Sequence, residues 1–174
     1  MAKLNPKSIV YSFEPCKKVY DILVENIKIN KLDNVKAYNL AVTKKSIETI
    51  TLTTYGIISG ANTIHADIEK FKNVYKTTVL QEQVKCISFD EIINTNNIEE
   101  IQLLKIDCEG AEYDIIYDSE MFKKGIVKNM VGEFHNLKYN KLQEKGANLI
   151  KYCKKYVKMV KVSVLIMVDY YYQC

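Results

Sequence analysis

The sequence predicts an α/β fold whose sheet is mostly parallel, and two stretches of the chain carry this prediction. In the first, an apolar run over Ser8–Phe13 is followed by a helical pattern from about Cys16 to about Asn30 and by a second apolar run over Val35–Val42. A strand, a helix and a strand in succession favour a parallel, right-handed crossover. In the second, the run Leu103–Ile106 ends abruptly in acids and a glycine before another helical pattern. Such a strand delivers polar side chains to the carboxyl edge of a parallel sheet, where α/β proteins bind ligands.

Both the start and the periodicity of the first helix are visible in the sequence. Pro15 suits the first turn of a helix, because the N–H that proline lacks has no partner there. Val19, Leu23 and Ile27 then recur at intervals of four residues, which predicts that they form the buried face. The exit turn is expected at Asn30–Asn34.

The middle of the chain is expected to be a β-hairpin insertion at about residues 46–90. Ile47–Tyr55 and Thr77–Ile87 alternate between apolar and polar residues, as antiparallel strands with one solvated face do. Three shorter elements are predicted beside these strands: a loop over Gly56–Asn62, a short helix within Ala61–Phe71, and a helix over Phe89–Ile93 that Ser88 opens.

The last third continues the alternation of helices and strands. The predicted elements are a helix from about Ala111 to Lys123, a strand over Ile126–Phe134 and a helix over Tyr139–Tyr156 with Gly146 as its weak point. The run from Val157 to Tyr172 is predicted to form two strands that turn near Lys161–Val164. The C-terminal strand would then be antiparallel to the rest of the sheet.

The composition is that of a globular protein and narrows the choice of partners. The 174 residues are enough for one domain with a core, so we expect a single domain over residues 1–174. All 25 basic residues are lysine, which lacks the bidentate fork of arginine, and nucleic acid is therefore not expected as a partner. No apolar run approaches the roughly 18–20 residues that span a bilayer, and no secretory signal is visible. We expect a cytoplasmic protein without a membrane partner.

The five cysteines are expected to be reduced and structural. They are far apart and show no C-x-x-C spacing, which argues against a disulfide framework and against a structural zinc site.

Three predicted strands end in polar residues that would share one edge of the sheet. These residues are Glu14 after the first strand, Asp107 and Glu109 after Leu103–Ile106, and Glu133 and His135 at the end of the next. A carboxylate between a strand and a helix can bind both hydroxyls of a ribose, and Glu14 has that context. The other four can form an oxygen-rich pocket with one imidazole, which holds a divalent cation or acts as a general base toward a hydroxyl. The alternative to these functional roles is that the acids only cap helices and that His135 is a structural histidine.

Five segments, in this order, resemble the FkbM-type S-adenosylmethionine-dependent methyltransferases: Val10–Pro15, Leu23–Asn30, Asn39–Val42, Leu104–Glu112 and Glu133–His135. The Lys-Ile-Asp-x-Glu-Gly-x-Glu motif after a Phe-Glu-Pro is the most specific of them. The resemblance implies a Rossmann-like methyltransferase sheet and methyl transfer from S-adenosylmethionine to a hydroxyl. The implied acceptor is a sugar, a glycan or another small molecule.

The resemblance also implies roles for individual residues. The cofactor-binding residues would be Glu14 and Pro15 at the ribose, Leu40 and Ala41 near the adenine, and Asp107 near the transferred methyl group. Together with the shared sheet edge described above, this makes Asp107, Glu109, Glu133 and His135 the expected catalytic residues. A divalent metal is compatible with this set of side chains but is not predicted.

The chain departs from the family pattern in its glycines. The family's sheet opens with a strand, an Asp-x-Gly-x-x-x-Gly loop and a helix, which together need roughly 25 residues. Only seven residues precede Ser8, and all six glycines lie at or after Gly56. We therefore expect an N-terminally truncated sheet without the glycine-rich cofactor loop.

The expected truncation has a consequence for strand pairing. Ile9–Phe13 would pair directly with Leu103–Ile106, or an exposed sheet edge would favour homo-oligomers. Two alternatives to an active methyltransferase stay open: a non-catalytic remnant or interaction module, and a metal-dependent enzyme that uses the acid cluster without S-adenosylmethionine.

Overall fold

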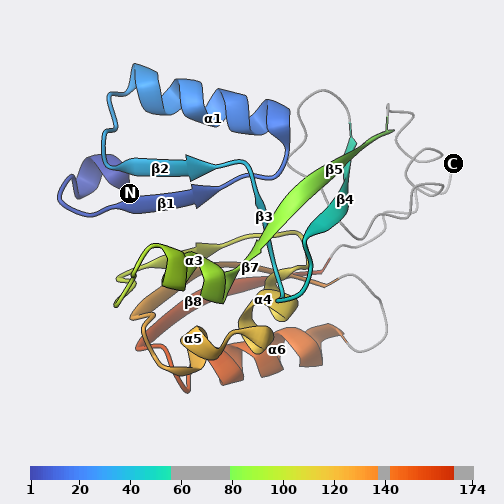
Figure 1. Cartoon of the computed structure of the whole chain (residues 1–174). Coiled ribbons are helices and arrows are strands. Elements are labelled where there is room, and N and C mark those ends of the chain that lie inside the picture. Colours follow the sequence, from blue (N-terminus) through green and yellow to red (C-terminus); the bar gives the residue numbers. More distant parts are fainter. Residues whose placement is uncertain (56–78, 137–141, 167–174) are drawn as a thin grey trace, which may run out of the picture. The chain divides into compact units, whose positions relative to one another are not determined.

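The computed structural model describes residues 1–55, 79–136 and 142–166, and it divides into two compact units, Met1–Ile87 and Ser88–Cys174 (Figure 1). Both units combine helices with strands, which confirms the predicted α/β class. A single Rossmann-like sheet and a single domain over residues 1–174 stay predictions. Among the described residues, no helix is both long enough and apolar enough to cross a membrane.

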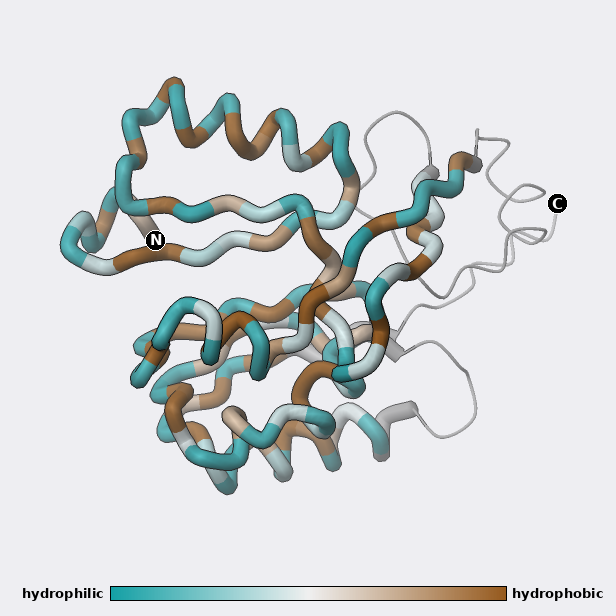
Figure 2. Tube along the Cα trace, in the orientation of Figure 1, coloured by the Kyte–Doolittle hydropathy of each residue, from teal (hydrophilic) through white to brown (hydrophobic). Residues whose placement is uncertain are grey.

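The first unit opens with the predicted strand–helix–strand. β1 (Val10–Phe13) pairs in parallel with β2 (Val35–Tyr38), and α1 (Lys17–Ile29) connects them and lies along the pair in Figure 1. Hydrophobic and hydrophilic residues alternate along α1 (Figure 2). Its less exposed side chains are those of the predicted face and its neighbour: Val19, Tyr20, Leu23 and Ile27.

The predicted single strand over Val35–Val42 is wrong. β2 ends at Tyr38, and β3 (Ala41–Thr43) belongs to a different sheet. The side-chain amide of Asn39 donates to the backbone oxygens of Glu14 at 2.9 Å and Pro15 at 2.8 Å. An asparagine that binds carbonyls outside the ladder offers the chain an alternative to continued strand pairing, so the strand breaks here.

The two alternating segments of the middle third form an antiparallel pair. β4 (Thr49–Tyr55) pairs with β5 (Val79–Ser88), and β3 lies on the other side of β5. Four buried side chains make the core of this part of the unit: Cys16, Ala41, Leu52 and Val84. That the pair is an insertion stays a prediction, and the loop and helix expected within residues 56–71 lie outside the described residues.

The second unit is built on three parallel strands, with β7 (Asn129–Asn136) between β6 (Leu104–Ile106) and β8 (Met159–Ile166). The predicted turn near Lys161–Val164 is wrong, because β8 continues through it and pairs in parallel with β7. The reason is the connection: α6 (Leu142–Cys153) contacts both strands and provides the long crossover that parallel neighbours need. No antiparallel strand therefore occurs at residues 159–166; the rest of the predicted hairpin lies outside the described residues.

The helix predicted from Ala111 to Lys123 is divided in two at Ser119. α4 (Glu112–Asp118) ends there and α5 (Glu120–Lys123) begins. The Ser119 hydroxyl accepts a hydrogen bond from Phe122 N at 2.9 Å, and it donates to buried Asp90. A serine that caps a new helix in this way ends the preceding one.

Asp90 belongs to α3 (Phe89–Thr95), which begins as predicted at Ser88 with a reciprocal capping box to Glu91. Its carboxylate also accepts from the backbone nitrogens of Glu120 and Met121, each at 3.1 Å. Asp90 therefore fixes the start of α5 against α3 within the second unit.

Candidate functional site

A close approach of two strands prepares the site. Ile106, the last residue of β6, is the pairing partner of Gly132 in β7. A Cβ atom built on Gly132 would lie 1.8 Å from the carbonyl oxygen of Ile106, so only glycine fits there. Because Asp107 follows Ile106 and Glu133 follows Gly132, this contact brings the two carboxylates to the same edge of the sheet.

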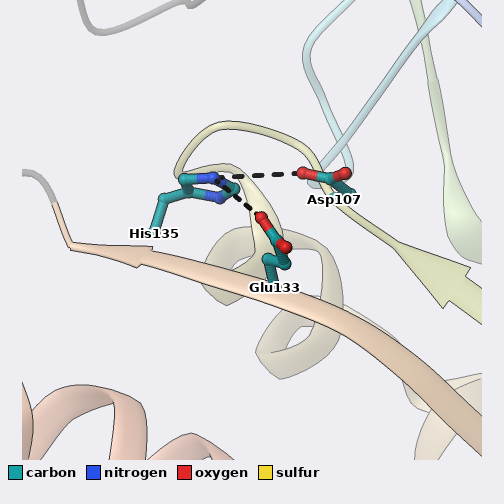
Figure 3. Close-up of side chains that lie close together, drawn as sticks. All are labelled: Asp107, Glu133 and His135. Atoms are coloured by element: carbon teal, nitrogen blue, oxygen red, sulfur yellow. Dashed lines mark ion pairs between the residues drawn. The ribbon is translucent and has the colours of Figure 1, made fainter. Parts of the chain in front are cut away.

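His135 lies at the centre of the cluster and is 4% exposed. Its Nε2 atom is 3.7 Å from Glu109 Oε2, 3.9 Å from Asp107 Oδ1 and 4.0 Å from Glu133 Oε2. Figure 3 shows Asp107 and Glu133 approaching the imidazole from two segments of the chain. The four residues that the sequence assigns to catalysis therefore lie together in this structure.

Glu112 is a fifth member of the cluster that the sequence-based assignment leaves out. It is 0% exposed, and its Oε1 atom lies 2.9 Å from His135 Nδ1. The same carboxylate accepts from the backbone nitrogens of Cys108 at 2.8 Å and Gly110 at 2.9 Å. The carboxylate accepts from these donors, so we assign the proton of this hydrogen bond to Nδ1. Glu112 belongs to the Glu-Gly-x-Glu motif, but a glutamate in the first turn of a helix is also favourable to the helix dipole, so the motif alone does not identify it as a site residue.

The turn between β6 and α4 has an unusual backbone. Glu109 has φ 49° and Gly110 has φ 106°. The value at Gly110 is readily adopted by glycine alone, and a glutamate in the left-handed region is uncommon and often marks a functional site. This turn directs Glu109 toward His135 and places the Gly110 N–H at the Glu112 carboxylate.

The cluster perturbs the protonation of its members. The hydrogen bond to Glu112 raises the pKa of His135, burial opposes it, and the nearby carboxylates raise it further. Burial raises the pKa of Glu109, and the negative charge of Asp107 adds to this while His135 opposes it. Burial also raises the pKa of the Cys108 thiol to about 12, which disfavours its thiolate form.

Two of the carboxylates give the cluster access to solvent. The side chain of Asp107 is 33% exposed and that of Glu133 is 44% exposed. Lys105 Nζ lies 3.0 Å from Asp107 Oδ2, which leaves Oδ1 toward His135. The arrangement is a buried imidazole behind accessible carboxylate oxygens, which can accept a hydrogen bond or a proton from a hydroxyl.

The remaining predicted residues lie in the first unit. Glu14 follows β1, its backbone nitrogen donates to Tyr38 O at 3.1 Å, and its Oε1 atom accepts from Cys16 N at 2.9 Å. Burial is the main cause of the raised pKa of Glu14. Pro15 precedes the N-cap Cys16, so it lies just before the helix and not in its first turn.

The two residues expected near an adenine differ in burial. Ala41 is 5% exposed and belongs to the core of its unit, whereas Leu40 is half-buried. A purine at this position would therefore meet Leu40 and the backbone in preference to the Ala41 methyl group. Asp107, the fifth residue expected at the cofactor, belongs to the second unit.

Parallel strands with a histidine–carboxylate cluster at their carboxyl ends form the kind of ligand site that α/β enzymes use. The chain matches the Methyltransferase FkbM domain over residues 1–158, and it belongs to that family. The resemblance found in the sequence is thereby confirmed.

One curated relative is "Methyltransferase 1" of Beauveria bassiana (strain ARSEF 2860). It is 25% identical over 145 residues, which are 76% of this chain and 57% of the relative. The chain therefore spans little more than half of that relative's length. No solved structure matches the chain significantly.

Proposed function

We propose that the chain transfers a methyl group from S-adenosylmethionine to the hydroxyl oxygen of a sugar or another small molecule. The observation that carries this proposal is the histidine–carboxylate cluster at the carboxyl ends of β6 and β7 in a member of a methyltransferase family. A hydroxyl is a weak nucleophile until its proton leaves, and the cluster offers several acceptors for that proton.

Glu14 suits the nucleoside part of the cofactor. Glu14 is half-buried and follows a parallel strand. Two hydrogen bonds fix its backbone: its N–H donates to Tyr38 O, and its carbonyl oxygen accepts from the side-chain amide of Asn39. Carboxylates in this context bind ribose hydroxyls. When bound, S-adenosylmethionine supplies an electrophilic methyl group on a sulfonium ion.

The residues of the cluster bind and deprotonate the acceptor. The exposed oxygens of Asp107 and Glu133 accept a hydrogen bond from its hydroxyl, and a member of the cluster takes the proton as the oxygen attacks. Glu112 holds the imidazole of His135 in a single orientation through Nδ1. Positioning and proton removal are the main requirements of this reaction.

Calorimetric titration of the chain with S-adenosylmethionine and S-adenosylhomocysteine tests cofactor binding. We expect micromolar binding that Glu14→Ala weakens about 10-fold to 100-fold, because hydrogen bonds to a charged group contribute about 1.5–3 kcal/mol. Glu25→Ala, on the exposed surface of α1, is the matched control and should bind as the unchanged chain does. A cooperative thermal melt without any binding would overturn the proposal and favour a non-catalytic module.

A second experiment tests the reaction itself, with methyl-labelled S-adenosylmethionine and a panel of sugars and small hydroxylated molecules. Glu133→Gln should slow label transfer about 10²-fold to 10⁴-fold, the usual contribution of a positioned base, without changing cofactor affinity. Equal rates for Glu133→Gln and the unchanged chain, together with equal rates for Glu109→Gln, would show that the cluster does not act on the acceptor.

A further inference from the structure

Three side chains of the cluster have the geometry of a metal site. Asp107, Glu133 and His135 each offer one ligand atom, and these atoms all lie within 4.8 Å of one another. Figure 3 shows the three side chains converging from the ends of β6 and β7. We propose that they bind a divalent first-row transition-metal ion through Asp107 Oδ1, Glu133 Oε2 and His135 Nε2.

His135 has the second contact that a metal-binding histidine usually has. Its Nδ1 atom is 2.9 Å from Glu112, a carboxylate with 0% exposure that two backbone N–H groups also hold. Ligating histidines typically donate the other ring N–H to a carboxylate, which fixes the ring and makes the free nitrogen more basic. Glu112 is therefore a positioning residue, and His135 Nε2 is the atom left to bind an ion.

The distances around Nε2 favour a shared cation over direct hydrogen bonds. Nε2 faces Glu109, Asp107 and Glu133 at 3.7–4.0 Å, which is beyond hydrogen-bond range, and within the described part of the chain it forms no hydrogen bond. A hydrogen bond to a carboxylate would shorten one distance to about 2.8 Å. Ligands about 2.0–2.2 Å from one ion, by contrast, lie up to about 4.4 Å apart.

The surroundings provide charge and freedom of movement for this ion. Lys105 pairs with Asp107 Oδ2, so Oδ1 stays directed at the site, and the Glu109 carboxylate adds a negative charge at its side. Asp107 and Glu133 are partly exposed, so their side chains can close on an ion by the few tenths of an ångström that coordination needs.

The donor set selects the class of metal. Two carboxylate oxygens and one imidazole nitrogen suit Mn²⁺, Fe²⁺, Co²⁺ or Zn²⁺, whereas Mg²⁺ and Ca²⁺ prefer oxygen alone. Three protein ligands also leave coordination positions open for water or for a hydroxyl. Ion binding does not depend on the methyl-transfer proposal, so either proposal can fail without the other.

Titration of the chelator-treated full chain with Mn²⁺ tests the site, followed by calorimetry and by the loss of the free Mn²⁺ signal in electron paramagnetic resonance. We expect one tight ion per chain and weaker binding of Mg²⁺. His135→Ala and Glu133→Gln should each weaken Mn²⁺ binding at least 10-fold. Glu100→Gln, an exposed acid of the same unit outside the cluster, should leave it unchanged.

Glu112→Gln tests the positioning role through a readout that general stability does not move. With Co²⁺ as the probe, we expect affinity to fall 10-fold to 100-fold and the visible spectrum of the bound ion to change, while the cooperative melt remains. The side chain of Glu133 is only half-buried, so its variant keeps the test valid if Glu112→Gln fails to fold. No binding of Mn²⁺, Co²⁺ or Zn²⁺ by the folded chain would overturn the proposal, as would binding that neither His135→Ala nor Glu133→Gln weakens.

Discussion

At the scale of single residues, the two units contain two differently built acids. Glu112 has no exposure, and its carboxylate accepts hydrogen bonds from three donors inside the second unit. Glu14 is half-buried, and its carboxylate accepts a hydrogen bond from the backbone nitrogen of Cys16. Burial dominates its environment and raises its pKa above 4.5. The first acid is built to hold the structure, whereas the second carries an unfavourable charge that a ligand can use.

Glu14→Gln should raise stability at neutral pH. A raised pKa in the folded state means that the fold favours the protonated carboxyl, so ionisation of Glu14 lowers stability as pH rises from the unfolded value through the folded value. Glutamine stays neutral and keeps the oxygen that accepts from Cys16. The urea midpoint of the variant should exceed that of the unchanged chain at pH 7, and the difference should vanish near about pH 3.5, where both forms are uncharged.

Glu25→Gln on the exposed face of α1 is the control and should show no such pH-dependent difference. A lower midpoint for Glu14→Gln at pH 7 would contradict the expectation and show that the Cys16 contact outweighs the cost of burial. If the gain in stability accompanies the loss of cofactor binding, Glu14 is retained for function.

At the scale of secondary-structure elements, the site depends on how closely β6 approaches β7. Gly132 permits that approach, and the backbone at Glu109 and Gly110 then turns the chain back into α4. The end of β6, the acids and His135 could be predicted from the sequence, because a run of apolar residues that ends in acids is a local pattern. The end of β7 could not, because the strand continues past the predicted end at Phe134 to Asn136. The direction of β8 could not, because its alternation suits parallel and antiparallel neighbours alike and only the packing of α6 decides between them.

Gly132→Ala should destabilise the second unit severely. The added Cβ would lie 1.8 Å from the Ile106 carbonyl oxygen, a backbone atom, so β6 and β7 must separate. We expect a loss of more than about 4 kcal/mol, beyond the range of ordinary substitutions, or no soluble protein. Urea unfolding measures the loss, and Val131→Ala, the neighbouring position in β7, should cost only about 1 kcal/mol. Similar midpoints for the two variants would mean that β6 can move away without cost.

At the scale of the whole molecule, the chain belongs to a methyltransferase family. Its own structure divides into two compact units. In the described part of each unit one cysteine is buried, Cys16 in the first and Cys153 in the second. Among the described residues, the cysteines are free thiols. That they are reduced and structural in the protein stays a prediction. They can therefore report on folding without reduction of the protein.

Cys153 should resist thiol reagents in the native protein. It is 0% exposed, and burial raises its pKa to about 12. At pH 8 its thiolate fraction would be about 10⁻⁴, over 10³-fold below that of an ordinary cysteine. Iodoacetamide labelling followed by peptide mass spectrometry should modify half-buried Cys86 before Cys153, and it should reach Cys153 only in urea. Rapid native labelling of Cys153 would show that α6 opens readily.

The sequence by itself determined the α/β class, the first helix and its less exposed face, the acids at the strand ends and the family. Each of these rests on residues that are close in the chain or on the order of short motifs. Only the tertiary structure decided that Glu112 binds His135, 23 residues away, and that Glu109, Asp107 and Glu133 surround the same imidazole. It also decided the break at Asn39 and the direction of β8. The reason is that a side chain's partner depends on which strands pack together, and local periodicity does not encode that choice.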